Sequence, residues 1–324
     1  MAKLIPTQIF SEHQSSNDDT KSADALVLAA MNGDSDSVKH LIENSDNSTG
    51  FIDAVDKNQW TALTRAAERK NKAMVKQLIE LGANVNARGG PRGWAPIHYV
   101  IANGDIGTLK FLLEQKAKQS VKINYDNDPP DTPPSQTPLI LAVRGNNIEV
   151  VKQLIENGAD PNEKDLYGAT AFHFAAKEGY VNIVKLLIEK GADVSIKVNY
   201  DDDESGTPPS ETGLMLASRN GHTDVMQLLL AAKGVDVNDQ NVRGSTALHF
   251  TALHGKTAAA NLLVEFRADV KIKNRFGWTP LHFAARNGHV EIMALLLSKG
   301  ANISTEVIKV IHSQLSMVFK VTWS

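Results

Sequence analysis

The sequence predicts an all-α repeat protein, in which pairs of short helices stack as a solenoid and hairpin-like loops join one pair to the next. Two observations carry this prediction. A phrase of the form Thr-Pro-Leu-His-x-Ala recurs along the chain, and the base interval between its copies is 33 residues. Within each copy, apolar residues recur at helical spacing and glycine separates one apolar run from the next.

The copies of the phrase follow one another along most of the chain. They start at positions 24, 61, 95, 137, 170, 212, 246 and 279, so successive starts are 37, 34, 42, 33, 42, 34 and 33 residues apart. The first copy lacks the Thr-Pro start, as terminal repeats often do. We therefore expect an array of eight repeats over 23–304. Its predicted boundaries are 23–56, 57–90, 91–132, 133–165, 166–207, 208–241, 242–274 and 275–304.

The last copy illustrates the elements of one repeat. Thr279 is placed to cap the first helix, and Pro280 occupies the first turn, where a missing N–H costs nothing. Gly288 ends that helix, because glycine tolerates a left-handed backbone. Ile292 and Leu296 belong to the apolar face of a second helix. One such pair cannot bury its apolar face alone, so stability requires stacked neighbours.

The chain resembles the ankyrin repeat family in its period, in its Thr-Pro-Leu-His phrase and in the closing turns of the type Gly-Ala-Asp-Val. The resemblance covers the eight copies and implies an ankyrin-type α-solenoid with β-hairpin loops. It also implies protein binding without catalysis. The histidines of the phrase, by the same resemblance, hydrogen-bond their own helix start to the neighbouring turn. These are His98, His173, His249 and His282.

Two intervals are longer than the others and contain nearly the same phrase. KINYDNDPPDTPPSQT at 122–137 and KVNYDDDESGTPPSET at 197–212 are identical at ten of sixteen positions. We interpret them as a duplicated repeat pair with a long hairpin, solvated or in contact with a partner. Neither loop has the glutamate that an EF-hand needs at its twelfth position. Thr132 and Thr207 precede proline, which makes phosphorylation of either loop a hypothesis.

The two ends differ from the repeats. Residues 1–22 are polar over most of their length, and we expect them to be disordered. Residues 305–324 are unusually apolar and are either a capping helix or the remainder of a larger protein. The sequence has no cysteine, no secretory signal and no run of about 20 apolar residues, so we expect no membrane span. A cytoplasmic protein is expected, or one delivered into a host cytosol if it is an effector.

Composition and motifs point away from catalysis. The net charge of −3 gives no overall attraction to nucleic acid. No phosphate-binding glycine loop and no set of nucleophile, base and orienting residue stands out from the repeat pattern. We expect no enzyme activity, no cofactor and no metal. The favoured function is a scaffold or adaptor, and the alternative is the recognition portion of a larger enzyme, channel or secreted bacterial effector.

The resemblance implies that a partner protein binds the concave face, which hairpin tips and the exposed side of the first helices form. Repeat phase places two groups of residues there. The hairpin group is Trp60, Arg92, Trp94, Tyr167, Arg243, Phe276 and Trp278. The helix-end group is Arg69, Arg144, Lys177, Arg219, His254 and Arg286.

Aromatic residues and arginine are enriched at binding hot spots, and bases outnumber acids at the helix ends. We therefore expect a monomer that binds an acidic or phosphorylated segment of another protein. The alternative for the tryptophans is that they only pack against neighbouring hairpins.

Overall fold

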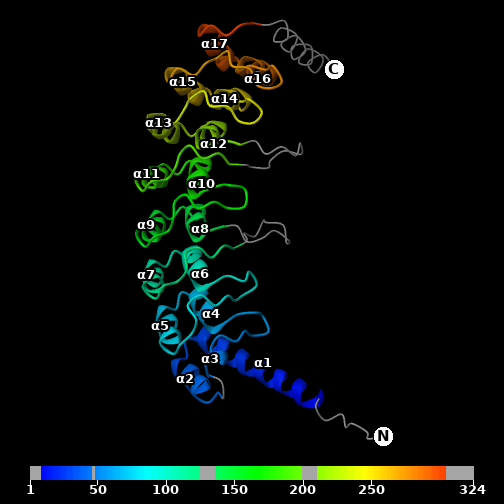
Figure 1. Ribbon diagram of the computed structural model, residues 1–324, viewed down its shortest axis with the longest axis vertical. Helices are drawn as coiled ribbons and strands as arrows, with labels where there is room; N and C mark the ends of the chain where they lie inside the picture. The colour runs from blue at the N-terminus through cyan, green and yellow to red at the C-terminus, as the bar shows by residue number, and fades with distance from the viewer. Residues whose placement is uncertain (1–8, 46–47, 124–135, 199–209, 304–324) are drawn as a thin grey trace, which may run out of the picture. The chain divides into compact units, whose positions relative to one another are not determined.

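The chain folds into successive helix pairs, as the sequence predicts (Figure 1). The computed structural model describes residues 9–45, 48–123, 136–198 and 210–303. The chain divides into two compact units, Met1–Ala159 and Asp160–Ser324. Each predicted repeat from residue 57 onward contains one helix pair. The all-α repeat fold is confirmed.

The first unit has two layers of helices. The first helices of successive pairs, α4, α6 and α8, pack side by side, and α1 packs against α4. The second helices, α5, α7 and α9, form the other layer, while the hairpins project from the first-helix side (Figure 1). The helices are α1 (Ile9–Asn32), α2 (Ser35–Glu43), α3 (Ser48–Phe51), α4 (Ala62–Glu68), α5 (Lys72–Glu80), α6 (Pro96–Asn103), α7 (Ile106–Glu114), α8 (Pro138–Arg144) and α9 (Ile148–Glu156).

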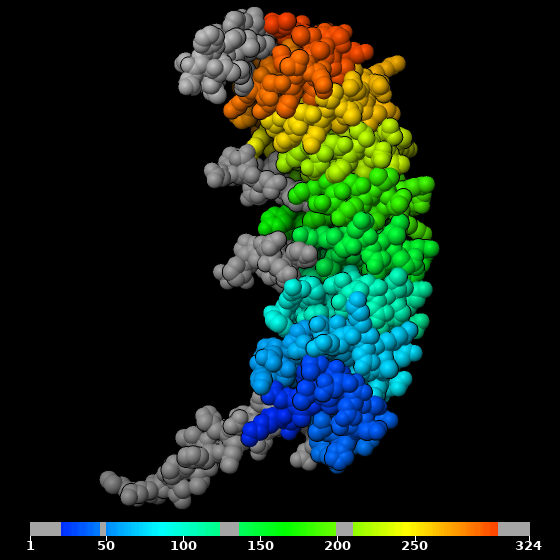
Figure 2. Space-filling view, turned by 180° about the vertical axis from the view of Figure 1, so that it is seen from behind, coloured from blue at the N-terminus to red at the C-terminus, as the bar shows by residue number. Residues whose placement is uncertain are grey.

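The second unit repeats the same arrangement. Helices α10, α12, α14 and α16 pack in order as one layer, and α11, α13, α15 and α17 pack as the other. Figure 2 shows these repeats, coloured from green to orange, stacked directly on one another. The helices are α10 (Ala171–Glu178), α11 (Val181–Glu189), α12 (Gly213–Asn220), α13 (Thr223–Ala231), α14 (Ala247–Leu253), α15 (Thr257–Glu265), α16 (Pro280–Asn287) and α17 (Val290–Ser298).

Side-chain caps set where many of these helices begin. Thr61 and Thr137 accept hydrogen bonds from the third backbone N–H of the first helices that follow them. Asn71, Asp105 and Asn147 do the same for second helices of the first unit. Such caps satisfy N–H groups that have no partner within the helix, and each contributes about 1 kcal/mol.

The core lies between the two helix layers of each unit. Leu63 and Leu78 of one pair and Leu248 and Leu263 of another are fully buried. Alanine at the contact between first helices, such as Ala66, lets their backbones approach closely. Each pair contributes half of an interface, so stability spreads from neighbour to neighbour.

The N-terminal segment differs from the prediction. Residues 1–22 were expected to be disordered, whereas the structure has one helix, α1, from Ile9 to Asn32, and residues 1–8 lie outside the described residues. No proline or glycine occurs between Ile9 and Gly33, and Gly33, with a φ of 74°, ends the helix. The C-terminal part of α1 buries Leu26 and Ala30 and packs on α4, so it serves as the first helix of the first repeat.

The hairpins have little β structure. In the described residues the strand pairing consists of three isolated antiparallel bridges, Gly89 with Trp94, Ile123 with Gln136, and Val198 with Glu211. The last two bridges close the bases of the long acidic loops. The loop tips at 124–135 and 199–209, with Thr132 and Thr207, lie outside the described residues, and so does the segment 305–324.

Candidate protein-binding site

A recurring turn fixes the tip of four hairpins. Five residues before the phrase stands a buried aspartate or asparagine whose Oδ1 accepts two backbone N–H groups, from the residues two and four positions later. At Asn274 the donors are Phe276, at 3.0 Å, and Trp278, at 2.9 Å. Turns of this kind are typical of Asx side chains, and here they hold the intervening residues in one conformation. The other three turns are centred on Asp56, Asp165 and Asn241.

The phrase histidines connect each hairpin to the preceding repeat. In His173, Nδ1 accepts the backbone N–H of Thr170, at 3.2 Å, and Nε2 donates to the carbonyl of Ile196, at 2.9 Å. His98 and His249 make the same pair of hydrogen bonds. Burial lowers the pKa of all three imidazoles to about 4. They are therefore neutral at pH 7 and are structural, as the resemblance implies.

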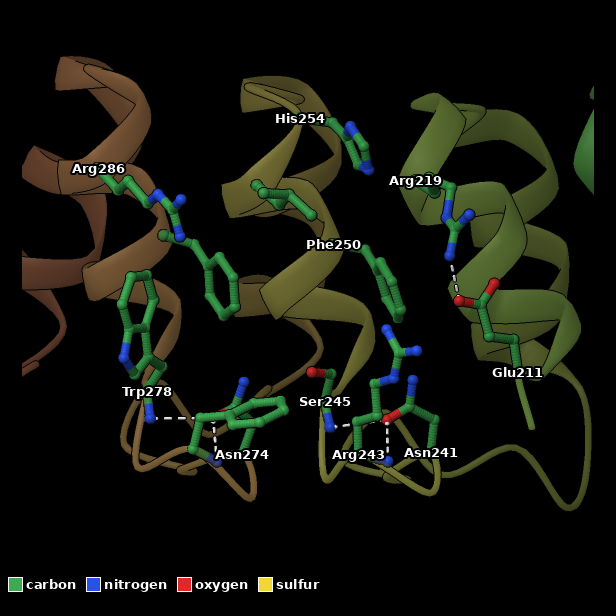
Figure 3. Close-up of a pocket in the computed structure, with 13 residues that line it drawn as sticks. Glu211, Arg219, Asn241, Arg243, Ser245, Phe250, His254, Asn274, Trp278 and Arg286 are labelled. Carbon is green, nitrogen blue, oxygen red and sulfur yellow. Dashed lines mark hydrogen bonds and ion pairs between the residues drawn. The ribbon is translucent and has the colours of Figure 1, made fainter. Parts of the chain in front are cut away.

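The second unit contains a groove of about 550 Å³ between the ends of α12, α14 and α16 and the hairpins that precede α14 and α16 (Figure 3). Six residues that the sequence predicts for partner binding come together there. We call this site the basic-aromatic groove. The six predicted residues are Arg219, Arg243, His254, Phe276, Trp278 and Arg286, and Glu211, Phe250 and Phe283 also line it.

Arg219 is held at one end of the groove by two interactions. It forms an ion pair with Glu211, whose side chain is fully buried, and Figure 3 shows the two groups pointing toward each other. Its guanidinium carbon also lies 4.8 Å from the ring centroid of Phe250. A cation over an aromatic face is attracted by the ring quadrupole. The guanidinium of Arg219 therefore has a fixed position before any ligand binds.

Aromatic rings form the other end of the groove. The guanidinium carbon of Arg286 lies 5.4 Å from the ring centroid of Trp278. The Trp278 ring in turn packs against Phe283, with 5.2 Å between centroids. Phe276, at the hairpin tip, is 72% exposed. An apolar surface beside a cation is thus open to a partner.

His254 lies between the two arginines, at the C-terminal end of α14 (Figure 3). Its pKa is lowered mainly by partial burial and further by the charges of Arg219, Lys256 and His289. The neutral form of the imidazole is favoured in the free protein. The row of helix ends therefore carries two permanent cations with a titratable group between them.

The hairpin tryptophans of the first unit are not part of an open surface. Trp60 and Trp94 are only 8% and 2% exposed. Tyr99 packs between them, with centroid distances of 5.1 Å and 5.3 Å, and the guanidinium carbon of Arg65 covers Trp60 at 3.9 Å. The packing alternative describes these two residues, because the aromatic Tyr99 fills the space that a partner would need.

The remaining predicted residues lie outside the groove. Arg92 lies over Trp94, with 4.8 Å from its guanidinium carbon to the ring centroid, and Arg69 pairs with Glu68 at 3.5 Å. Arg144 is in the last turn of α8. In the second unit, Tyr167 is an exposed hairpin residue, and Lys177 lies in the last turn of α10.

Two aromatic residues of the groove were missed by the sequence reasoning. Phe250 and Phe283 directly follow a phrase histidine. The same position holds Tyr99 and Phe174, so an aromatic column adjoining the phrase was visible in the sequence. The predicted partner-binding residues came from the hairpins and the ends of the first helices, and this position lies in the first turn of the first helix.

Neither a metal cluster nor a membrane span is found in the part of the chain that the structure describes. Its histidine, aspartate and glutamate side chains form no group of three or more that could hold a metal ion. Its one long helix, α1, is too polar to cross a bilayer.

Comparison with known proteins agrees with the repeat pattern. A family model described as ankyrin repeats (3 copies) matches residues 4–89, 26–125, 98–198 and 214–307. The chain belongs to the ankyrin-repeat family. Ankyrin repeats are protein-interaction modules, so an interaction role follows at the level of the family.

The curated relatives that this chain matches are very different from one another. NF-kappa-B inhibitor alpha of Sus scrofa is 26% identical over 67% of this chain and 59% of its own length. Alpha-latrocrustotoxin-Lt1a of Latrodectus tredecimguttatus is 30% identical over 60% of this chain and 14% of its own. The probable E3 ubiquitin-protein ligase XBOS33 of Oryza sativa subsp. japonica is 31% identical over 64% and 38%. The ankyrin chain thus spans between 14% and 59% of these relatives.

Proposed function

We propose that this ankyrin-repeat chain is a non-catalytic scaffold or adaptor whose basic-aromatic groove binds an acidic or phosphorylated segment of a partner protein. One observation carries the proposal. Arginines from three successive repeats, Arg219, Arg243 and Arg286, line a single groove together with Phe250, Phe276 and Trp278. Arginine and large aromatic residues are the side chains that contribute most at interfaces.

Charge supports an acidic partner. Three arginines and one described acid, Glu211, line the groove, which leaves two positive charges with His254 neutral, whereas the whole chain carries −3. A local patch of sign opposite to the rest of the surface orients an acidic segment and speeds its association. The net charge of −3 gives no overall attraction to nucleic acid.

We further propose that the chain acts as a monomer in the cytoplasm, or in a host cytosol if it is a delivered effector. The absence of cysteine agrees with a reducing compartment. Sedimentation equilibrium tests the first part, and the expected mass is 35.2 kDa for the chain alone.

The test of the binding function is selection from a displayed library of peptides taken from disordered protein segments. The bait is the whole chain, and the comparison bait carries Arg243→Glu and Arg286→Glu. We expect acidic peptides that bind the parent and are lost by the variant. A matched control, Arg267→Glu, changes an exposed arginine of the same unit that does not line the groove. Peptides retained by all three baits would place binding elsewhere, and no enrichment would contradict peptide binding.

A second candidate function is favoured by the length of the relatives. The chain matches only 38% of the probable ubiquitin ligase and 16% of a transient receptor potential channel of Homo sapiens. The array would then be the recognition part of a longer protein. An antibody against the array should detect a native species well above 35.2 kDa in that case, while a native species of that mass would contradict it.

A further inference from the structure

We propose that the ligand of the basic-aromatic groove is an extended peptide with one aromatic side chain between two acidic side chains about six residues apart. This inference rests on the proposed function and deepens it by specifying the pattern that the groove recognises. Three features carry it: the spacing of Arg219 and Arg286, the fixed position of both guanidinium groups, and the aromatic side chains that line the same groove.

The spacing follows from the helix stack. Arg219, His254 and Arg286 stand at the C-terminal ends of α12, α14 and α16, which pack in this order (Figure 3). Axes of packed helices are about 8–10 Å apart, so the two arginines are separated by roughly 16–20 Å. An extended chain advances about 3.3 Å per residue, which makes five or six residues. A separation of six also places both acidic side chains on the same face of the peptide.

Both guanidinium groups are positioned in the free protein. Glu211 and the ring of Phe250 hold Arg219, and the ring of Trp278 lies beneath Arg286. Stacking engages the face of a guanidinium, whereas its N–H donors lie in the plane and suit the two oxygens of a carboxylate. Because these side chains are already ordered, a ligand carboxylate does not lose affinity by immobilising them.

The aromatic surface of the groove selects an apolar group. Phe276 is 72% exposed although it borders Trp278 and the groove. Aromatic side chains bury about 150–250 Å² and pair well with other rings in tilted or edge-on arrangements. A peptide aromatic seated against Phe250, Phe276 and Trp278 would cover this surface. The hairpin turn at Asn274 keeps Phe276 in place for that contact.

The charge pattern also favours a peptide over single-stranded nucleic acid, which likewise binds cationic, aromatic grooves. A phosphate backbone presents anions without interruption. Along the row of helix ends, cations stand at both ends and His254, in its neutral form, lies between them, while the third arginine, Arg243, lies on the hairpin side of the groove (Figure 3). Two separated anions that flank an apolar group fit this order better than a continuous run of phosphates.

The test uses fluorescence anisotropy with the whole chain and defined ten-residue probes in a glycine-serine background. The first probe has glutamate at position 2, phenylalanine at position 4 and glutamate at position 8, and its mirror places phenylalanine at position 6. We expect one of them to bind at least tenfold more tightly than a probe with both glutamates next to the phenylalanine. Replacing phenylalanine by serine should weaken binding about tenfold or more. Replacing either glutamate by glutamine should weaken it about threefold or more.

Protein variants locate the contacts. Phe276→Ala and Arg286→Gln should each weaken the spaced probe about tenfold, because both side chains contact it directly. Arg267→Gln is the matched control and should bind like the parent. Circular dichroism and thermal unfolding verify that every variant is folded. Phe276 and Arg286 are exposed, so their replacement leaves the core intact.

Three outcomes would overturn the inference. Equal binding of the spaced and compressed probes would remove the spacing rule. Tighter binding of a ten-nucleotide oligothymidine than of any probe would assign the groove to nucleic acid. A library selection that yields ligands dependent on Arg243 and Arg286, but without the acidic-aromatic pattern, would remove this inference while leaving the proposed binding function in place.

Discussion

The Nε2 atom of His249 donates a hydrogen bond to the backbone carbonyl of Trp278, 3.1 Å away in the next repeat. On the other side of the ring, Nδ1 accepts the backbone N–H of Thr246, at 3.0 Å. One buried imidazole thus connects the start of its own helix to the hairpin that carries an aromatic residue of the groove. Proton uptake by this ring would break the acceptor side of the connection.

Acid should unfold the protein through these histidines. Burial lowers the pKa of His98, His173 and His249 to about 4, below the value of 6.5 for an exposed imidazole. Their neutral forms stabilise the fold fully above about pH 6.5, and this stabilisation is lost as the pH falls toward 4. The difference corresponds to roughly 3 kcal/mol per histidine. Urea unfolding between pH 7.5 and pH 4.5 should show a steep fall in the free energy of unfolding.

The matched variant for acid unfolding is His249→Gln. It should be less stable than the parent at pH 7.5, because glutamine does not reproduce both hydrogen bonds. It should also lose less stability on acidification, since one of the titrating groups is gone. Parallel pH profiles for the parent and the variant would show that His249 does not take up a proton on unfolding.

A second prediction concerns the left-handed residue of the hairpin turn. Gly168, Gly244 and Gly277 occupy this position two residues before the phrase, with φ of 80°, 75° and 77°, while the first described hairpin has Gln59 with φ of 65°. A side chain in this conformation costs about 1 kcal/mol. Gln59→Gly should therefore raise the free energy of unfolding by up to about 1 kcal/mol, and Gly277→Gln should lower it by a similar amount.

Chemical denaturation of both variants tests this prediction. A Cβ at Gly277 meets no atom within 4 Å, so the backbone conformation is the reason for the expected loss. An unchanged midpoint for Gly277→Gln would show that the turn adjusts without cost, and would contradict the account of both positions.

Most of the fold could be predicted because the same sequence pattern recurs in each repeat. Thr61 and Thr137 cap helices where the phrase begins, and Gly288 ends a helix where the pattern requires it. The exception is α1, whose polar N-terminal part has no apolar periodicity. Helix propensity and the absence of a breaker before Gly33 extended it beyond the boundary that patterning suggested.

The site was harder to predict, because the sequence gives the position of a residue within its repeat but not the side chains that surround it. Trp60, Trp94 and Trp278 occupy the same position in their repeats, yet Trp60 and Trp94 are buried and, of the three, only Trp278 lines the groove. The difference comes from the side chain that fills the space beside them, which is Tyr99 in the first unit. The ion pair between Glu211 and Arg219 connects two different positions of the repeat, and the repeat pattern alone does not indicate it.

That ion pair leads to a third prediction, in which the two partners differ. Glu211 is fully buried, whereas the side chain of Arg219 is 25% exposed. Arg219→Met removes the cation that is paired with a buried carboxylate, and Glu211→Gln leaves a cation that still reaches water. We expect Arg219→Met to cost about 3 kcal/mol in stability and Glu211→Gln clearly less. The double variant should lose less free energy of unfolding than the two single variants lose together. Simple additivity in denaturant unfolding would contradict the pairing.

The last prediction links pH to binding through His254. In the free protein its pKa is lowered by partial burial and by the charges of Arg219, Lys256 and His289. Carboxylates of an acidic peptide bound beside these groups favour the protonated imidazole, so the complex takes up a proton. Affinity for the spaced acidic probe should therefore rise as the pH falls from 7.5 to 5.5, by up to about tenfold for a pKa difference of one unit. The carboxylates of the probe remain ionised over this range.

In the His254→Gln variant the affinity should be nearly independent of pH, and anisotropy titrations at several pH values measure both slopes. Equal slopes for the parent and the variant would show that the bound peptide does not approach His254.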